Sequence, residues 1–204
     1  KATSNFSGFQ TNPSKHSLES SSGSEAGASV SSAGKRSCRP IFLSELRGAF
    51  PPNTFTQYVL ASSGLLDDFD VGINIQFTDG EREIIRAGFY PRYLHDGGGY
   101  AVFISAQRSY TLAYYVKNDK GELIWETLLP WTFHAALRDG LHQTNRLRVI
   151  CHGERFSIYL NGVVATSFKD TRYKRGRFFV AAAPTEKSSL GVVFSDLQLR
   201  EVQQ

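Results

Sequence analysis

Short runs in which apolar and polar residues alternate fill the last third of the chain. Every second position is apolar between residues 147 and 151, and again between residues 156 and 160. Turn-forming pairs separate these runs, among them Asn161-Gly162. A period of two places alternate side chains on one face of a strand. Such runs joined by turns predict antiparallel strands that bury one face.

The same pattern extends upstream. Residues 71–77 alternate strictly, and Asp79-Gly80 follows as a hairpin signal. Residues 81–90 are expected to pair back as a strand, and no stretch keeps a helical period over three turns. We therefore predict an all-β chain of about a dozen strands in two packed antiparallel sheets. The residues expected between the sheets are Ile73, Ile75, Phe77, Leu147, Val149, Phe156, Ile158, Leu160 and Phe194.

Composition divides the chain near residue 40. Residues 1–40 hold twelve Ser and carry five Lys or Arg against two Glu, so they are predicted to be a basic Ser/Gly-rich arm or linker. Residues 41–53 are expected to connect, as an edge strand or a helical turn, to a sandwich at residues 54–204. The arm's apolar residues are widely spaced, as in a strand added to another sheet. They are Phe6, Phe9, Leu18 and Val30.

The order of the C-terminal elements resembles concanavalin-A-like, or laminin-G-like, jelly-roll domains. The matching features include the N-x-L-x-V run from Asn145, the Asn161-Gly162 turn and the final VFSD at residues 193–196. The resemblance covers roughly residues 54–202 and is closest to non-catalytic bacterial surface domains and 3-keto-disaccharide hydrolase-like relatives. It implies a two-sheet jelly roll, and it implies that Asp170 caps a loop. It also implies carbohydrate or protein binding in an extracellular or cell-surface setting.

Paired carboxylates are the first candidates for catalysis. Related β-glucanases carry two Glu around an Asp on one strand, as nucleophile and acid. Here Glu81 and Glu83 are two residues apart, but Arg82 stands between them in place of the Asp. We interpret them as solvated charges at a strand end, and we expect no catalytic residues. A glycoside hydrolase remains the less favoured alternative.

Aromatic residues are better candidates for ligand contact. Alternation places Tyr110 and Tyr114 on one strand face and Tyr115 on the other, so each ring either packs in the core or stacks on a sugar or protein partner. A basic loop around Tyr173 forms either a solvated rim or an anion site. The candidate ligand-binding residues are Trp125, Trp131, Tyr110, Tyr115, Tyr173 and Arg175.

The two cysteines allow two interpretations. Cys151 is either a buried free thiol or one half of a disulfide with Cys38, within the chain or between copies. His95-Asp96 precedes three glycines and is either a hairpin loop or a calcium loop of the kind that the resemblance implies. No metal or cofactor is predicted.

Several partner classes are disfavoured by the composition. The arm's basic residues are too sparse, and lack the interleaved aromatics, for a nucleic-acid site. No apolar run is long enough to cross a bilayer.

Two functions are favoured over the glycoside hydrolase. The first is a non-catalytic extracellular module that binds a glycan or a cell-surface protein. The second is a structural subunit of a surface filament or other assembly, a homo-oligomer in which the N-terminal arm packs on a neighbouring copy. The path of the arm distinguishes the two functions.

Overall fold

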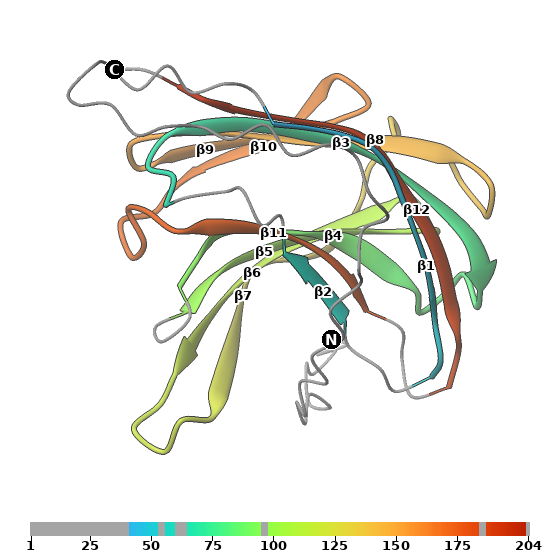
Figure 1. Ribbon diagram of the computed structural model, residues 1–204, viewed down its shortest axis with the longest axis horizontal. Coiled ribbons are helices and arrows are strands. Elements are labelled where there is room, and N and C mark those ends of the chain that lie inside the picture. The colour runs from blue at the N-terminus through green and yellow to red at the C-terminus, as the bar shows by residue number, and fades with distance from the viewer. Residues whose placement is uncertain (1–40, 53–55, 60–64, 95–97, 184–186, 203–204) are drawn as a thin grey trace, which may run out of the picture.

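The strands of the described residues form two antiparallel sheets packed face to face (Figure 1). The computed structural model describes residues 41–52, 56–59, 65–94, 98–183 and 187–202, which contain no helix. The first sheet has the order β1 (Ile41–Phe50), β12 (Leu190–Glu201), β3 (Phe69–Gly80), β8 (Thr144–His152), β9 (Arg155–Leu160) and β10 (Val163–Lys169). The second has the order β2 (Thr56–Val59), β11 (Arg177–Ala183), β4 (Arg86–Tyr93), β5 (Gly98–Ser105), β6 (Ser109–Lys117) and β7 (Leu123–Phe133). The predicted all-β, two-sheet sandwich is confirmed.

Apolar residues from both sheets meet in one core between them. All nine residues expected there are at most 1% exposed. They are joined by Tyr100, Val102, Ile104 and Leu112 from the second sheet. Because the side-chain period of a strand is two, this inward set determines which residues point outward from each sheet.

The segment before residue 54 contributes a strand of its own. β1 pairs with β12 along its whole length, from Ile41 opposite Leu199 to Phe50 opposite Leu190. It is an edge strand of the first sheet, which is one of the two conformations expected for residues 41–53. The sandwich therefore includes residues 41–50, ahead of the expected start at residue 54.

The strand expected at residues 81–90 begins only at Arg86, and it pairs with β11 and β5 in the second sheet instead of pairing back onto β3. Residues 82–84 form a turn in which the amides of Ile84 and Ile85 both donate to the carbonyl of Glu81, each at 3.1 Å. Ile85 is fully buried at the end of this turn, and β4 starts only at Arg86. The expectation was wrong for residues 81–85, because two adjacent isoleucines fit a turn that buries one of them.

Of the two hairpin turns that the sequence predicts, Asn161-Gly162 is confirmed between β9 and β10. The prediction was wrong for Asp79-Gly80, because these residues end β3 and the next strand, β4, belongs to the other sheet. Asn161 and Gly162 have φ of 49° and 84°, so both adopt the left-handed conformation that a two-residue hairpin turn requires. The Asn161 side chain holds this turn in place, since its Nδ2 donates to the carbonyl of Ala136 at 2.7 Å. Asp170 lies in the next loop and accepts from the Tyr100 hydroxyl at 2.6 Å and the Arg172 amide at 2.9 Å. This is the capping role that the resemblance implies.

Cys151 is fully buried at the end of β8, with its Sγ 3.9 Å from the carbonyl oxygen of Gly153. Cys38, its partner in the alternative disulfide, lies outside the described residues, as do the arm residues Phe6, Phe9, Leu18 and Val30. The pairing and the role of the arm stay predictions. The described residues also include no helix of the length and hydropathy that a membrane span needs.

Candidate functional site

The outward-facing sides of the two sheets differ in chemistry. The first sheet presents polar, partly exposed side chains to its outer side, such as Asp70, Asn74 and Arg148. This is the usual pattern for an antiparallel sheet with one solvated face. The second sheet instead presents a cluster of aromatic side chains, separate from the core. This second cluster is a candidate binding surface, because three of its aromatic rings are partly exposed on the outer side of the sheet.

Strand alternation produces this second cluster. On β4 Phe89 joins the core and Tyr90 joins the outer cluster, while on β6 Tyr114 points inward and Tyr115 outward. β7 adds its two tryptophans, and its Trp125 lies directly opposite Tyr115. We call the outer cluster the aromatic face and define it by Tyr90, Tyr93, Phe103, Tyr115, Trp125, Trp131 and Phe179.

Tyr90 lies at the centre of the aromatic face. Its ring centroid is 5.6 Å from that of Phe103 and 5.7 Å from that of Tyr115, with interplanar angles of 86° and 90°. Trp125 lies 6.2 Å away at 53°. Edge-to-face contacts at these distances are favourable for aromatic quadrupoles. The rings therefore support one another and hold a fixed surface.

The cluster has a buried base and a more accessible rim. Tyr90, Tyr115 and Phe179 are 1%, 3% and 7% exposed. Tyr93, Trp125 and Trp131 are only partly buried and pack against that base. Trp125 approaches Tyr115 to 4.8 Å between centroids, and Tyr93 approaches Phe179 to 4.4 Å. The rim residues come from β4 and β7, which are separated by β5 and β6 in the sheet. Figure 1 shows the β6–β7 hairpin projecting beyond the rest of the sheet.

Small residues allow the rings to lie close to the sheet. A Cβ on Gly99 would lie 3.1 Å from the Tyr115 hydroxyl and 2.8 Å from the carbonyl oxygen of Arg92. Ala101 and Ala181 also lie within the aromatic face and are almost fully buried. Glycine at position 99 therefore leaves room for the Arg92 carbonyl and the Tyr115 hydroxyl close to β5.

Two polar groups lie within or beside these rings. Burial raises the pKa of Tyr115 far above its ordinary value, so this hydroxyl stays protonated. It is buried and has no hydrogen-bond partner among the described residues. Arg86 is two positions before Gly88 and four before Tyr90, so it shares their outward direction. Burial lowers its pKa, yet a guanidinium remains charged in proteins.

The structure brings three of the six sequence candidates together. Tyr115, Trp125 and Trp131 all belong to the aromatic face. Tyr110 instead packs in the core, where its hydroxyl donates to the carbonyl of Ala165 at 3.2 Å. Tyr173 packs against the core as well, and its hydroxyl donates to the backbone carbonyl of Tyr115 at 2.8 Å.

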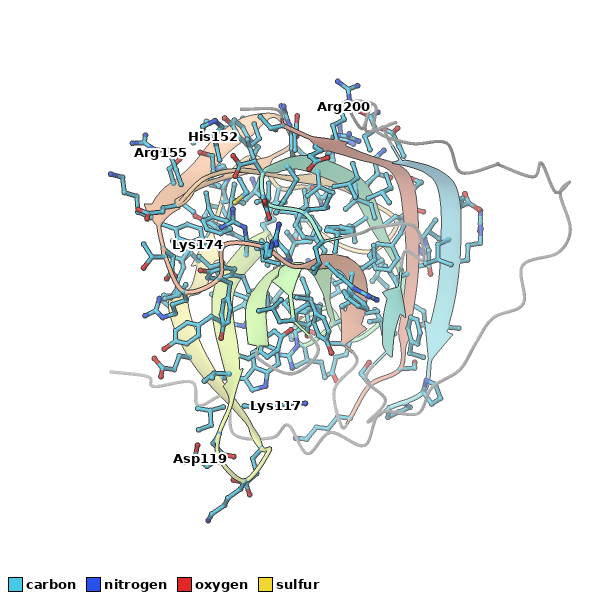
Figure 2. The ribbon with its side chains drawn as sticks, turned by 60° about the vertical axis from the view of Figure 1, so that its left-hand side comes forward. Lys117, Asp119, His152, Arg155, Lys174 and Arg200 are labelled. Carbon is cyan, nitrogen blue, oxygen red and sulfur yellow. The ribbon has the colours of Figure 1, made fainter. Side chains whose placement is uncertain are left out.

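Arg175, the sixth candidate, lies away from the aromatic face. It is exposed and ion-paired with Asp67, with 2.9 Å between Nε and Oδ1. Figure 2 shows its neighbour Lys174 in the loop that leads into β11. The basic loop is thus a charged rim.

Four aromatic residues of the aromatic face were not among the sequence candidates: Tyr90, Tyr93, Phe103 and Phe179. A signal for Tyr90 is present in the sequence, because alternation with the inward-facing Phe89 already assigns it to the outer side. Phe103 and Phe179 similarly alternate with Val102 and Val180. Neighbouring outward aromatics on several strands could have been sought as a set.

The candidate acids do not form a catalytic pair on a strand. Glu81 and Glu83 lie at the turn before β4, and both are exposed. Glu83 accepts a hydrogen bond from Gln107 at 3.3 Å. The possible calcium loop at His95-Asp96 lies outside the described residues. Within the part of the chain that the structure describes, no three His, Cys, Asp or Glu side chains gather as a metal site.

Solved structures share this two-sheet arrangement. The carbohydrate-binding module CBM66 from Bacillus subtilis superposes with a TM-score of 0.57 at 15% identity, over 79% of this chain and 95% of that chain. The fold is a concanavalin-A-like jelly roll. Bacillus licheniformis β-glucanase superposes with a TM-score of 0.50 at 8% identity, over 78% of this chain and 79% of its own. No protein-family model matches the sequence, and no curated protein matches it.

Proposed function

We propose that this chain is a non-catalytic carbohydrate-binding module whose aromatic face holds the sugar. The contrast between the two outer sheet faces carries the proposal. The first sheet has polar outward residues, whereas the second carries seven aromatic side chains outside the core. A surface of this composition is typical of ligand recognition.

Saccharides suit the aromatic face better than a wholly apolar ligand. The partly exposed rings of Tyr93, Trp125 and Trp131 can stack on the C–H faces of sugar rings, while Arg86 supplies a charged donor. The similar solved structure from Bacillus subtilis is itself described as a carbohydrate-binding module, which supports this ligand class. An extracellular or cell-surface location accords with the proposal, because polymeric glycans are accessible there.

The non-catalytic part of the proposal rests on the carboxylates. Glycosidases need two carboxyl groups on either side of the scissile bond, about 5 to 9.5 Å apart. Glu81 and Glu83 lie at a turn and are exposed to solvent, and they are not part of the aromatic face. A sugar on the aromatic face would therefore be held without a paired nucleophile and acid from these two residues.

Glycan-array binding by the full chain and by Trp131→Ala and Trp125→Ala variants tests the proposal. We expect the parent chain to bind a subset of glycans. Each tryptophan variant should weaken that binding by roughly tenfold, equivalent to about 1.4 kcal/mol, because one stacking surface is lost. The same preparations are assayed for β-glucan hydrolysis, and we expect none.

Tyr159→Ala is the matched control, since Tyr159 is a partly buried aromatic on β9 in the opposite sheet. It should bind like the parent chain. A parent chain that binds no glycan, or tryptophan variants that bind unchanged, would contradict the proposal. Hydrolysis that disappears in Glu81→Gln or Glu83→Gln would contradict its non-catalytic part.

The aromatic face also keeps the assembly function open as a second candidate. An arm with sparse apolar residues can bind only a preformed apolar acceptor, and the mutually packed rings of the aromatic face form such a surface. In this alternative the arm of a neighbouring copy occupies the aromatic face in place of a sugar. A blank glycan array combined with self-association would favour it.

A further inference from the structure

A hollow of about 300 Å³ lies on the outer side of the first sheet, away from the aromatic face. It extends across β12, β3 and β8, which are adjacent in that sheet. Its lining is polar and rich in arginine, unlike the apolar aromatic face. The residues that line it are Asp70, Gly72, Arg146, Arg148, Gln198 and Arg200.

A missing side chain creates the floor of the hollow. Gly72 on β3 lies opposite Arg148 on β8 and opposite Gln198 on β12. The guanidinium of Arg146 reaches over this glycine, and a Cβ there would lie 2.8 Å from Nη2. The absence of a side chain at Gly72 therefore lets the Arg146 guanidinium lie directly against the backbone of β3.

Two of the arginines are held in fixed positions. Arg148 donates from Nε and Nη2 to the two carboxylate oxygens of Asp70, each at 2.7 Å. Arg146 donates from Nη1 to Asp196 Oδ2 at 2.7 Å and to Asn74 Oδ1 at 3.1 Å. Bidentate and charge-assisted contacts of this kind restrict the side chains before any ligand arrives.

A β-bulge brings Asp196 to this position. β12 advances from Ser195 to Gln198 while β3 advances only from Asn74 to Gly72, so β12 carries one extra residue. Asp196 lies in that interval with φ of 47°, a conformation that Asp tolerates better than most residues. Bulges often redirect a side chain in this way. Here the bulge supplies the carboxylate that anchors Arg146.

Positive charge remains after these pairs are counted. Three guanidiniums face two carboxylates, those of Asp70 and Asp196. Arg200 is exposed and has no hydrogen bond or ion pair with any described residue. Arg146 likewise keeps its Nε and Nη2 donors without a partner among the described residues. Donors held in place around an uncompensated positive charge suit an oxyanion.

We propose that this hollow binds an oxyanion group, namely the carboxylate, sulfate or phosphate of a small ligand. Arg200 and Arg146 would donate to the anion above the backbone floor at Gly72. Asp70 and Asp196 hold Arg148 and Arg146 rather than coordinate a cation, because their oxygens already accept from guanidiniums. The proposal goes beyond sugar binding at the aromatic face and does not depend on it.

The test is an NMR titration of the full chain with sodium sulfate, sodium phosphate and sodium glucuronate, at constant ionic strength maintained with sodium chloride. We expect saturable shifts of the Gly72 and Gln198 amide signals, with dissociation constants on the order of millimolar. Saturation by any of the three salts supports the site. The anion with the lowest dissociation constant shows whether the site prefers a free tetrahedral anion, such as sulfate or phosphate, or the carboxylate of a sugar acid.

Arg200→Gln is the informative variant, because an exposed side chain without a partner can be replaced without unfolding the sheet. This variant should weaken anion binding roughly fivefold or more. Arg200→Lys should bind with intermediate affinity, because lysine keeps the positive charge but lacks the planar guanidinium that donates two parallel hydrogen bonds. Arg155→Gln is the matched control. Figure 2 shows Arg155 and Arg200 at separate positions on the first sheet. This control should bind like the parent chain.

Several results would overturn the proposal. One is that none of the three salts gives saturable shifts of the Gly72 and Gln198 amide signals. Another is that the Arg155→Gln and Arg200→Gln variants lose anion affinity equally. An equal loss of anion affinity in the two variants would mean that the anions respond to the overall positive charge of the protein and not to a specific site. The Trp131→Ala variant separates this proposal from the sugar site. It should keep the anion response in full, so a blank glycan array leaves the oxyanion result unaffected.

Discussion

Arg92 is the most deeply buried charged residue of the described chain. It is 2% exposed and lies at φ of 53° in β4. Its guanidinium donates to the carbonyl oxygens of Asp67, Tyr173 and Gly153 at 2.6 to 2.9 Å, and it lies 3.5 Å from the Asp68 carboxylate. These carbonyls belong to three separate loops. One side chain thus joins the end of β4 to segments that precede β3, β9 and β11.

We predict that Arg92→Met lowers the free energy of unfolding by about 3–5 kcal/mol, because it leaves the Asp68 carboxylate buried without its counter-charge. Urea denaturation followed by tryptophan fluorescence measures the change. Arg175→Ala is the control: it removes an exposed ion pair with Asp67 and should cost less than about 1 kcal/mol. Equal losses for the two variants would show that Arg92 acts as a surface charge does.

Cys151 provides a second prediction at the scale of one residue. Burial raises the pKa of its thiol from 9.0 to about 12, so thiolate is scarce at neutral pH. In a Cys38→Ser background, iodoacetamide at pH 8 should react at least roughly 100-fold faster in urea than in buffer. Mass spectrometry of the alkylated chain gives both rates. A fast reaction in buffer would mean that this end of β8 opens readily.

The sign of the accompanying pH effect follows from the same shift. The folded state favours the neutral thiol, so its contribution to stability is complete below the unfolded-state pKa near 9.0. That contribution falls as the pH rises from there toward about 12, because only the unfolded chain ionises. Unfolding measured between pH 8 and pH 10.5 should therefore show a smaller pH dependence in a Cys151→Ala variant than in its parent.

At the scale of elements, strict alternation predicted the strands well and one turn poorly. β3, β8 and β9 alternate without interruption, and their inward residues are all buried. The run from Glu81 does not alternate in the same way, since Ile84 and Ile85 are adjacent. Local sequence does not decide which of two neighbouring isoleucines will be buried. That choice depends on the core to which the chain returns.

β7 is a strand whose end cannot be located from its own sequence. β7 extends from Leu123 to Phe133 and passes through Pro130, a residue that usually ends a strand. A proline is tolerated there because β7 is the last strand of its sheet, where an amide hydrogen is not needed on the open side. Two register shifts accompany this extension. Neither edge position nor register can be read from a single strand's sequence.

The sequence predicted only those residues of the candidate binding site that are close to one another along the chain. Tyr115, Trp125 and Trp131 lie within seventeen residues of one another in the sequence, so a local search found them together. Tyr90 and Phe179 are distant in sequence, and only the pairing of β11 with β4 places them opposite each other. Tyr110 was selected by its aromatic character, since alternation separated it from Tyr115 but did not decide which of the two strand faces points inward. A site that extends across a sheet therefore needs the strand order, which the sequence does not provide.

At the scale of the whole molecule, one sandwich presents two unlike outer faces. The aromatic face and the arginine hollow lie on opposite sheets with the core between them. A ligand on one face therefore has no direct contact with a ligand on the other. The simplest expectation is independent binding, in which an acidic glycan and a neutral glycan are held at the same time.

The arm is the remaining question at this scale. Burying a Phe contributes roughly 1.5–3 kcal/mol, whereas ordering the backbone costs about 1–2 kcal/mol per residue. The four apolar residues of the arm can therefore offset the ordering of only a few residues each. The arm would need backbone hydrogen bonds to a sheet edge or a preformed apolar acceptor in order to bind a neighbouring copy.

We predict that deleting residues 1–36 leaves a folded sandwich and changes its assembly state. The fold should persist because β1 and the whole core lie beyond the deletion. Circular dichroism checks the fold, while light scattering and electron microscopy measure the size distribution. A full-length variant with Ser at positions 6, 9, 18 and 30 is the matched control, and it should behave like the truncated chain if the apolar residues are responsible. An unchanged size distribution in both would mean that the arm is a tether, and sugar binding would then be the better-supported function.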